Sequence, residues 1–242
     1  MILKGKKAVI TGSGRRVGRE LVRTFAGKGA RIAIHCRHSG QEAEALLQEI
    51  GGTAAGHELF RFDLTDAEEL EKTAPALFAD ASILINNASV YIRRTIEAET
   101  PEDMAEQMTV NCMAPIRLMQ YFTRYGNRPG VIINLLDQGI CRPDQQSFSY
   151  GLSKKTLADA TRAAALQLAP DIRVNGLAPG PVLPPVNMPG SKMEKTLRSI
   201  PLRRPVGLQD LCAGAVFLAE NESVTGSILF IDCGQSLMQQ PE

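Results

Sequence analysis

A tyrosine and a lysine four residues apart, Tyr150 and Lys154 in SYGLSKK, are residue types whose spacing permits proton chemistry. Residues i and i+4 share one face of a helix. A cation beside a phenol favours the phenolate, which lowers the tyrosine pKa from its ordinary value of about 10. The pair therefore predicts a tyrosine that gives or takes a proton near neutral pH. The spacing by itself fits an exposed helix pair equally well.

Three glycines follow the first apolar run of the chain, in TGSGRRVG. Gly12, Gly14 and Gly18 stand where a strand would turn into a helix. The N-terminus of such a helix offers free N–H groups and a positive dipole to a pyrophosphate. The spacing differs from the GxGxxG of most dinucleotide folds, because Arg16 stands where many such loops have a close-packing glycine. We predict a phosphate loop, with a plain tight turn as the alternative.

The residues after the second apolar run indicate which dinucleotide is bound. An acidic residue there binds the ribose 2′-OH of NAD, whereas arginine accommodates a 2′-phosphate. The run ends in HCRHSG, without an acid, and guanidinium groups bind phosphate in a bidentate manner. We predict NADP(H), with Arg15, Arg37, His38 and Ser39 near the phosphate. The alternative is that these residues are solvated surface charges.

Seven short apolar or β-branched runs alternate with helical patterns along the chain. Several runs are apolar at nearly every position, which is typical of parallel strands covered on both faces. The alternation predicts an α/β fold with a doubly wound sheet. The predicted strands are residues 7–11, 31–36, 58–64, 82–87, 130–136, 172–178 and 227–232, and the predicted helices are residues 17–28, 41–50, 66–78, 102–124, 149–168 and 209–220.

Two polar segments lie at strand ends. Asp63 in FDLTD could accept a hydrogen bond from an adenine amino group, while Thr65 or Asp66 caps the next helix. The spacing leaves binding and capping open. Residues 179–207 are rich in proline and glycine and interrupt the alternation. Ligands bind outside the carboxyl ends of strands in open α/β sheets, so we predict an irregular substrate-covering loop there, with a plain surface connection as the alternative.

Length and composition predict one domain over residues 1–242, with 44% hydrophobic residues to supply its core. The net charge of 27 − 26 = +1 calls for neither nucleic acid nor an anionic membrane. No apolar run approaches the roughly 20 residues of a membrane helix. Five scattered cysteines without a CxxC pair support neither a disulfide framework nor a metal site. We expect a cytoplasmic protein with reduced, buried thiols.

Together these pieces resemble the short-chain dehydrogenase/reductase family over almost the whole chain. The matching pieces are TGSGRRVG, Asp63-Leu64, NNAS at 86–89, Asn111 in VNCMAP, GVIINLLD, Tyr150 with Lys154, IRVNGLAPG and TGSILFIDCG. The resemblance implies a single Rossmann-like domain whose seven-stranded parallel sheet has helices on both faces. It also implies hydride transfer with a nicotinamide cofactor, and a homotetramer that packs the helices near 102–124 and 149–168 across subunits.

The same resemblance assigns roles to individual residues. Tyr150 is expected to donate a proton, Lys154 to bind the nicotinamide ribose and tune Tyr150, and Asn111 to hold a proton-relay water. With the phosphate residues above, the expected cofactor residues are Gly12, Gly14, Arg15, Arg16, Val17, Gly18, Arg37, His38, Ser39, Asp63, Leu64, Asn87, Ala88, Tyr150, Lys154, Pro179 and Gly180.

Asp137 departs from the family pattern. Most members have a serine thirteen residues before the tyrosine, where it polarises a substrate carbonyl or hydroxyl, whereas this chain has Asp137. A carboxylate cannot donate to a carbonyl oxygen unless it is protonated. The site is therefore poorly suited to ketone reduction and favours a substrate with nitrogen groups. Asp137 could instead serve only as a helix cap or turn residue.

The pteridine reductase branch of the family is similar to this chain in several places. It has an aspartate at this position, a TGxxxRxG loop, NNAS and a late Met-Pro segment, matched here by Asp137, Arg16, NNAS followed by Tyr91, and NMPG at 187–190. The resemblance implies that Arg16 reaches the phosphates and the substrate, and that Tyr91 stacks on a flat pterin unless it is ordinary surface packing. The expected substrate residues are Arg16, Ser89, Tyr91, Asp137, Tyr150 and Met188.

Three functions are weighed on these grounds. The main hypothesis is NADPH-dependent reduction of a dihydropterin, such as dihydrobiopterin, dihydromonapterin or dihydrofolate, with Tyr150 as proton donor and Asp137 passing that proton. The second is a carbonyl or hydroxyl dehydrogenase that has replaced its serine. The third is a non-catalytic NADP-sensing regulator, which the intact set of Asn111, Tyr150 and Lys154 argues against. We expect no metal, no nucleic acid and no membrane partner.

Overall fold

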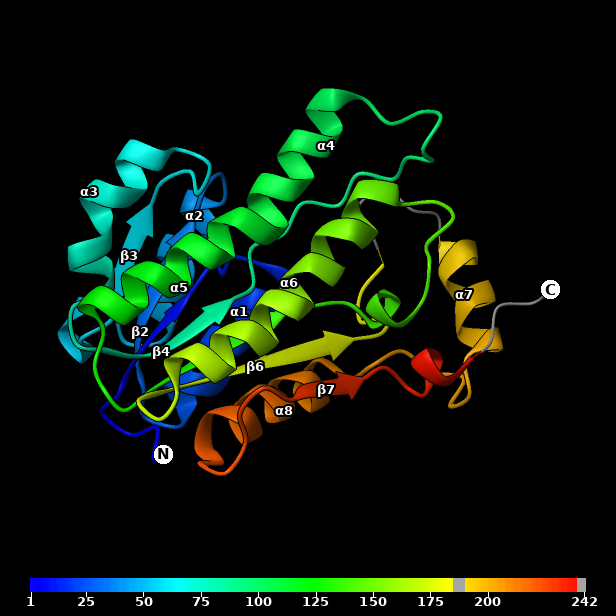
Figure 1. The fold of residues 1–242 in the computed structure, drawn as a ribbon. Helices are drawn as coiled ribbons and strands as arrows, with labels where there is room; N and C mark the ends of the chain where they lie inside the picture. Colours follow the sequence, from blue (N-terminus) through cyan, green and yellow to red (C-terminus); the bar gives the residue numbers. More distant parts are fainter. Residues whose placement is uncertain (185–189, 239–242) are drawn as a thin grey trace.

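The structure is a computed structural model that describes residues 1–184 and 190–238. Seven parallel strands form one sheet in the order β3-β2-β1-β4-β5-β6-β7. Helices lie on both of its faces (Figure 1). The predicted doubly wound α/β fold with a seven-stranded parallel sheet is confirmed. The strands are β1 Lys7–Ile10, β2 Arg31–Cys36, β3 Glu58–Arg61, β4 Ala81–Asn86, β5 Gly130–Leu135, β6 Ile172–Pro179 and β7 Ile228–Ile231.

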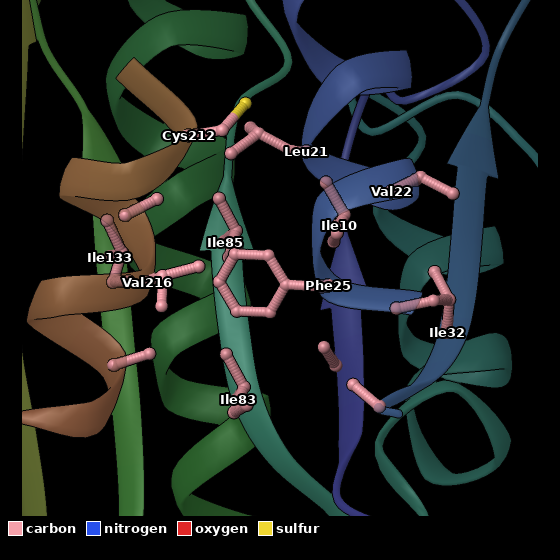
Figure 2. Packing of buried hydrophobic residues seen from close by; sticks show 14 of the residues in the cluster. Ile10, Leu21, Val22, Phe25, Ile32, Ile83, Ile85, Ile133, Cys212 and Val216 are labelled. Atoms are coloured by element: carbon pink, nitrogen blue, oxygen red, sulfur yellow. The ribbon is translucent and has the colours of Figure 1, made fainter. Parts of the chain in front are cut away.

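Each face of the sheet has its own apolar core. The helices are α1 Arg16–Gly27, α2 Gly40–Glu49, α3 Ala67–Phe78, α4 Pro101–Met108, α5 Ala114–Tyr125, α6 Phe148–Leu168, α7 Gly190–Ser199 and α8 Leu208–Glu220. Figure 2 shows Phe25 of α1 and Val216 of α8 packed on Ile85 and Ile133 of the sheet. On the other face, Phe78 and Phe122 bring α3 and α5 together edge to face, at 5.8 Å between ring centroids.

The central strands β1, β4 and β5 are buried along their whole length. This burial explains their continuous apolar sequences, since both faces of each strand are covered. The strand order reverses between β1 and β4. In open α/β sheets, ligands bind beyond the carboxyl ends of the strands at such a reversal. The topology therefore directs attention to the loops after β1 and β4.

The helix predicted over residues 102–124 is interrupted. A π-helical segment, Thr109–Met113, separates α4 from α5. Pro115 at the start of α5 has no N–H and cannot donate the usual i→i−4 bond to the carbonyl of Asn111. Single π turns inside α-helices often occur at functional sites. Asn111, a predicted site residue, lies at the centre of this π-helical segment.

Residues 179–207 are not irregular throughout, so the prediction of an irregular loop is partly wrong. The segment contains α7, while residues 185–189, and with them Met188, lie outside the described residues. Ile200 and Val206 are buried and anchor the return to α8. The third predicted strand is also shorter than expected and ends at Arg61 rather than residue 64.

No helix within the described ranges is long and apolar enough to cross a membrane. All five cysteines are free thiols. Cys36, Cys112 and Cys212 are buried as expected, but Cys141 is exposed.

Candidate active site

A cavity of about 1440 Å³ opens at the carboxyl ends of β1, β2, β4 and β5. Single ligand sites commonly occupy about 300–1,000 Å³, so this space is large enough for a dinucleotide together with a substrate. Most of the predicted residues line it: Gly12, Arg15, Arg16, Val17, Gly18, Arg37, His38, Ser39, Asp63, Leu64, Asn87, Ala88, Ser89, Tyr91, Asp137, Tyr150 and Gly180. Four do not form part of its wall: Gly14, Asn111, Lys154 and Pro179.

The glycine loop is closed so tightly that it excludes side chains. Gly12 has φ 61°, and a Cβ there would lie 2.7 Å from Cα of Ala88. A Cβ at Gly18 would lie 2.5 Å from the carbonyl oxygen of Gly12, and one at Gly14 would clash with Oγ of Ser39. The N-cap residue of α1, Arg15, makes no side-chain capping bond. The first-turn N–H groups are thus available to an anion, and the loop fits a pyrophosphate.

Asp63 and Arg37 are bound to each other at the adenosine end of the cavity. Nε of Arg37 lies 2.7 Å from Oδ2 of Asp63, whose Oδ1 accepts from the backbone N–H of Thr65 at 2.9 Å. The capping role belongs to Asp66, which accepts from the N–H groups of Glu68 and Glu69 at the start of α3. Asp63 does not cap α3, and it holds Arg37 at the cavity edge. Its expected bond to an adenine amino group stays a prediction.

Tyr150 and Asp137, both expected to act in proton transfer, are hydrogen-bonded to each other. The Tyr150 hydroxyl donates to Oδ2 of Asp137 at 3.1 Å, while Oδ1 accepts from the backbone N–H of Gly139 at 2.7 Å. Asp137 follows β5 and begins the 3-10 turn Gln138–Cys141. The carboxylate therefore has both of the roles considered from the sequence, since it caps a turn with one oxygen and contacts the tyrosine with the other.

The pKa of Tyr150 is raised well above its usual value, because the phenol is buried and lies beside the charge of Asp137. The net lowering of this pKa that the Tyr150–Lys154 spacing predicted is therefore not found, because burial and Asp137 outweigh any effect of Lys154. Nζ of Lys154 donates to the carbonyl of Leu135 at 2.8 Å and lies 5.8 Å from the Tyr150 ring centroid. Burial also raises the pKa of Asp137 and lowers that of Lys154 to about 8. Tyr150 consequently holds its proton at neutral pH, as a donor must.

The side chain of Asn111 is fully hydrogen-bonded. Oδ1 accepts from Oγ of Ser89 at 2.9 Å and from the N–H of Val90 at 2.8 Å. Nδ2 donates to the carbonyl of Val90 and to Oγ of Ser153. The side-chain amide is therefore saturated and has no hydrogen-bonding group to spare for a water, so the relay role expected for Asn111 stays a prediction.

Two comparisons bear on the family. A family model described as enoyl-(acyl carrier protein) reductase matches residues 12–236. A solved short-chain dehydrogenase/reductase from Serratia marcescens aligns with a TM-score of 0.89 at 28% identity, over 98% of this chain and 100% of that one. The chain belongs to the short-chain dehydrogenase/reductase family. It is therefore an oxidoreductase, and membership confirms the prediction of a nicotinamide cofactor, which this family uses.

Similar members of the short-chain dehydrogenase/reductase family differ in substrate. FolM alternative dihydrofolate reductase 1 from Brucella canis, solved as a complex with NADP, aligns with a TM-score of 0.92 at 31% identity, over 99% of this chain and 97% of that one. Glucose 1-dehydrogenase of Gluconobacter oxydans is 28% identical over 248 residues, covering 96% of this chain and 92% of that protein. Family membership therefore leaves the substrate to be argued from the site.

Tyr91 lies directly beside Tyr150 in this short-chain dehydrogenase/reductase. Its ring meets that of Tyr150 edge to face, at 4.8 Å between centroids and an interplanar angle of 82°. Its hydroxyl pairs with Oγ of Ser147 at 2.9 Å, and 46% of the residue remains exposed. The hydroxyl fixes the ring while leaving an aromatic surface on the cavity wall.

Arg16 occupies a backbone position that favours glycine. Its φ is 54°, in the left-handed region, which costs an L-residue roughly 1–2 kcal/mol. Its Nη2 donates to the carbonyl of Pro184 at 2.8 Å. The side chain thus links the phosphate loop to the start of the segment over the cavity. A strained residue that persists at a ligand site points to a function for its side chain.

His35 is a residue of this site that the sequence did not reveal. Its buried ring accepts the N–H of Gly12 at Nδ1, at 3.2 Å, and Nε2 bonds the carbonyl of Phe62 at 3.1 Å. The ring is therefore neutral with its proton on Nε2, and burial lowers the pKa of His35 to about 4. It joins the phosphate loop to β2 and to the end of β3. A lone histidine inside an apolar strand gave no sequence signal for this contact.

Proposed function

We propose that this chain catalyses the NADPH-dependent reduction of a dihydropterin, such as dihydrobiopterin, dihydromonapterin or dihydrofolate. The observation that carries the proposal is the 3.1 Å bond between the Tyr150 hydroxyl and Asp137. An ionised carboxylate accepts hydrogen bonds and cannot donate them. Pterins present ring and amino N–H groups to such an acceptor, whereas a ketone presents only an oxygen lone pair.

The choice of NADP(H) rests on Arg37 and on the lack of an acidic residue directly after β2. Arg37, His38 and Ser39 line the cavity after β2 in place of an acidic residue, and Arg37 is held there by Asp63. The NADP bound to the Brucella canis protein supports the same choice. The bound cofactor supplies the hydride. The glycine loop would hold its pyrophosphate, and Lys154 would bind the nicotinamide ribose.

The residues of this chain supply and control the proton. Tyr150 keeps its proton because of burial and the neighbouring charge of Asp137, and it would donate to the pterin ring nitrogen next to the reduced carbon. Lys154 carries a positive charge below a pH of about 8, which would stabilise the phenolate as it forms. Asp137 would accept a substrate N–H or help return a proton to Tyr150.

Tyr91 and Arg16 would position the ring system. The exposed ring of Tyr91 offers a flat surface for stacking, and Arg16 lines the same cavity from the phosphate loop. Ser89 lines the cavity as well, while its hydroxyl donates to Asn111. Met188, also expected at the substrate, lies outside the described residues.

A carbonyl or hydroxyl dehydrogenase is the second candidate. The observation that favours it is the raised pKa of Asp137, which results from burial, because a protonated carboxyl group can donate to a carbonyl oxygen. Similarity to glucose 1-dehydrogenase supports the same candidate.

A substrate panel tests the proposal. We expect the protein to oxidise NADPH with 7,8-dihydrobiopterin, 7,8-dihydromonapterin or 7,8-dihydrofolate and to show little activity on simple ketones and aldoses. Absorbance at 340 nm, a property of the reduced nicotinamide, would be followed at saturating NADPH, with NADH as the cofactor control. Turnover of ketones or sugars without any dihydropterin turnover would reject the pterin assignment in favour of the second candidate.

Arg16→Gly is expected to separate stability from binding. Glycine relieves the left-handed backbone, so the free energy of unfolding should be unchanged or rise by up to about 1 kcal/mol. The affinities for NADPH and for dihydropterin should both fall, because the guanidinium is lost from the cavity. Chemical denaturation and fluorescence titration measure the two effects.

Arg15→Ala is the matched control for this variant. Arg15 has an extended backbone, with φ −153°, so its replacement removes a neighbouring cation without relieving strain. Should Arg16→Gly leave both affinities at the wild-type level, Arg16 has no role at this site.

The remaining expectations stay predictions. These are a single domain over residues 1–242, a cytoplasmic location and a homotetramer. Exposed apolar side chains on the helices expected to meet across subunits, Met104 of α4 and Leu152 of α6, support the last of these.

A further inference from the structure

Gln235 reaches the cavity from the far end of the chain. It begins the short 3-10 helix Gln235–Leu237, which follows β7, and it lines the same cavity as Asp137 and Tyr150. Its Oε1 is shielded from solvent and has no hydrogen-bond partner among the described residues. The described residues contain five buried polar side-chain atoms without a hydrogen-bond partner. Among these five, only Oε1 of Gln235 belongs to a residue that lines the cavity.

The turn that carries Gln235 is firmly held. Asp232 accepts the N–H of Gly234 at 2.9 Å with one oxygen and that of Ser236 at 2.5 Å with the other. The carbonyl of Cys233 accepts the N–H of Leu202 at 3.2 Å. Gln235 is therefore placed by its backbone, and its amide is the part that is free to choose a partner.

Other polar side chains on the same wall already have partners. Gln138 is the closest comparison, because its Oε1 accepts from Nη2 of Arg142 at 3.3 Å. Arg16 donates to Pro184, and Asp144 accepts the N–H of Gln146 at 2.8 Å. An unpaired buried oxygen is destabilising, and a hydrogen bond from a ligand N–H would remove that penalty.

We propose that Gln235 is a specificity-determining residue whose amide binds the polar edge of the substrate ring. The terminal torsion of glutamine is broad, so a small rotation turns the oxygen toward the cavity. An amide offers an acceptor beside a donor, which matches a ring N–H or amino group beside a ring acceptor, as in the pyrimidinone half of a pterin. The substrate class rests on the proposed function. The position of the unpaired amide does not depend on it.

Gln235→Met tests this inference, because methionine has a similar length and no amide. We expect KM for 7,8-dihydrobiopterin to rise about tenfold, with kcat changed less than about threefold and NADPH affinity unchanged. The thermal midpoint should not fall, since the side chain of Gln235 shows no hydrogen bond to the described residues. Gln138→Met is the matched control: it should lower the midpoint through the lost bond to Arg142 and leave KM near the wild-type value.

A second measurement covers the case in which Gln235→Met folds poorly. In the wild type, kcat/KM is compared between 7,8-dihydrobiopterin and the analogue with a carbonyl in place of the 2-amino group, and the same ratio is measured in Gln235→Leu. The ratio should fall toward one in the variant. An unchanged KM in Gln235→Met, or an unchanged ratio in Gln235→Leu, overturns the role of Gln235 while wild-type dihydropterin turnover still supports the proposed function. Absence of that turnover in the wild type is the failure of the proposed function itself.

Discussion

Tyr150→Phe should lower kcat/KM for dihydropterin reduction by about a thousandfold, within the range of about 10²–10⁴ that general acid catalysis contributes. Under the proposed function the phenol donates the proton, and burial and Asp137 raise its pKa so that it stays protonated. Phenylalanine has no hydroxyl to take over that donation. In this variant we expect Asp137 to stay in place, because its Oδ1 accepts a hydrogen bond from the backbone N–H of Gly139 at 2.7 Å. NADPH oxidation measured at saturating cofactor gives the effect.

Tyr91→Phe is the matched control, because it removes a hydroxyl from the adjacent ring. That hydroxyl bonds the buried Ser147 at 2.9 Å and is not hydrogen-bonded to Asp137. We expect a loss of about 1 kcal/mol in stability and activity within a few-fold of wild type. NADPH affinity should survive in Tyr150→Phe. If that variant retained every measurable function of the protein, the reading as a non-catalytic NADP-sensing regulator would replace the enzymatic one.

Asp137→Ser should lower dihydropterin turnover by about a hundredfold or more and leave ketone turnover unchanged or raised. Serine restores the hydroxyl that polarises a carbonyl, but it removes the acceptor for substrate N–H groups and for the Tyr150 hydroxyl, now 3.1 Å from Oδ2. The measurement is kcat/KM of wild type and of Asp137→Ser, each determined with a dihydropterin and with a ketone. A variant that reduces dihydropterin as well as wild type does would remove the basis of the proposed function.

Asp137→Asn removes the negative charge of the side chain while keeping its size, so it tests the effect of that charge on Tyr150. The amide is the same size as the carboxylate, and its oxygen can keep the N–H of Gly139. The charge of Asp137 raises the pKa of Tyr150, so its removal should shift the alkaline limb of the kcat profile toward lower pH. An alkaline limb that stays at its wild-type position in Asp137→Asn would show that Asp137 does not control the tyrosine proton.

The sequence by itself determined the sheet. All seven predicted strands are present, because strands buried on both faces must be apolar at nearly every position and therefore stand out in the chain. It also determined the phosphate loop, since Gly12 and Gly18 stand where any Cβ meets backbone atoms at 2.7 Å or less. Arg16 was recognisable for the same reason, because it occupies a place where glycine is favoured.

Two elements, the helix α7 and the π-helical segment Thr109–Met113, were harder to predict from the sequence. The helix α7 lies inside a segment rich in proline and glycine, a composition that is typical of loops rather than helices. The π segment around Asn111 has the same apolar spacing as the α-helix that it interrupts. Pro115 is the one residue in the sequence that indicates the interruption, because a proline cannot donate a helical backbone hydrogen bond. The spacing of the apolar residues does not change when a single helical bond is lost, so it gave no further indication.

The protonation of Tyr150 depends on contacts that the fold makes and the sequence spacing does not show. The i to i+4 spacing placed Lys154 on the face of Tyr150, yet Lys154 donates to Leu135 and the phenol donates to Asp137. A pKa depends on burial and on the groups that touch the titrating atom, and here the touching group comes from the end of β5. The roles of His35 and Gln235 could not be predicted for the same reason. The partners of His35 and the cavity wall around Gln235 come from parts of the chain that only the fold brings together.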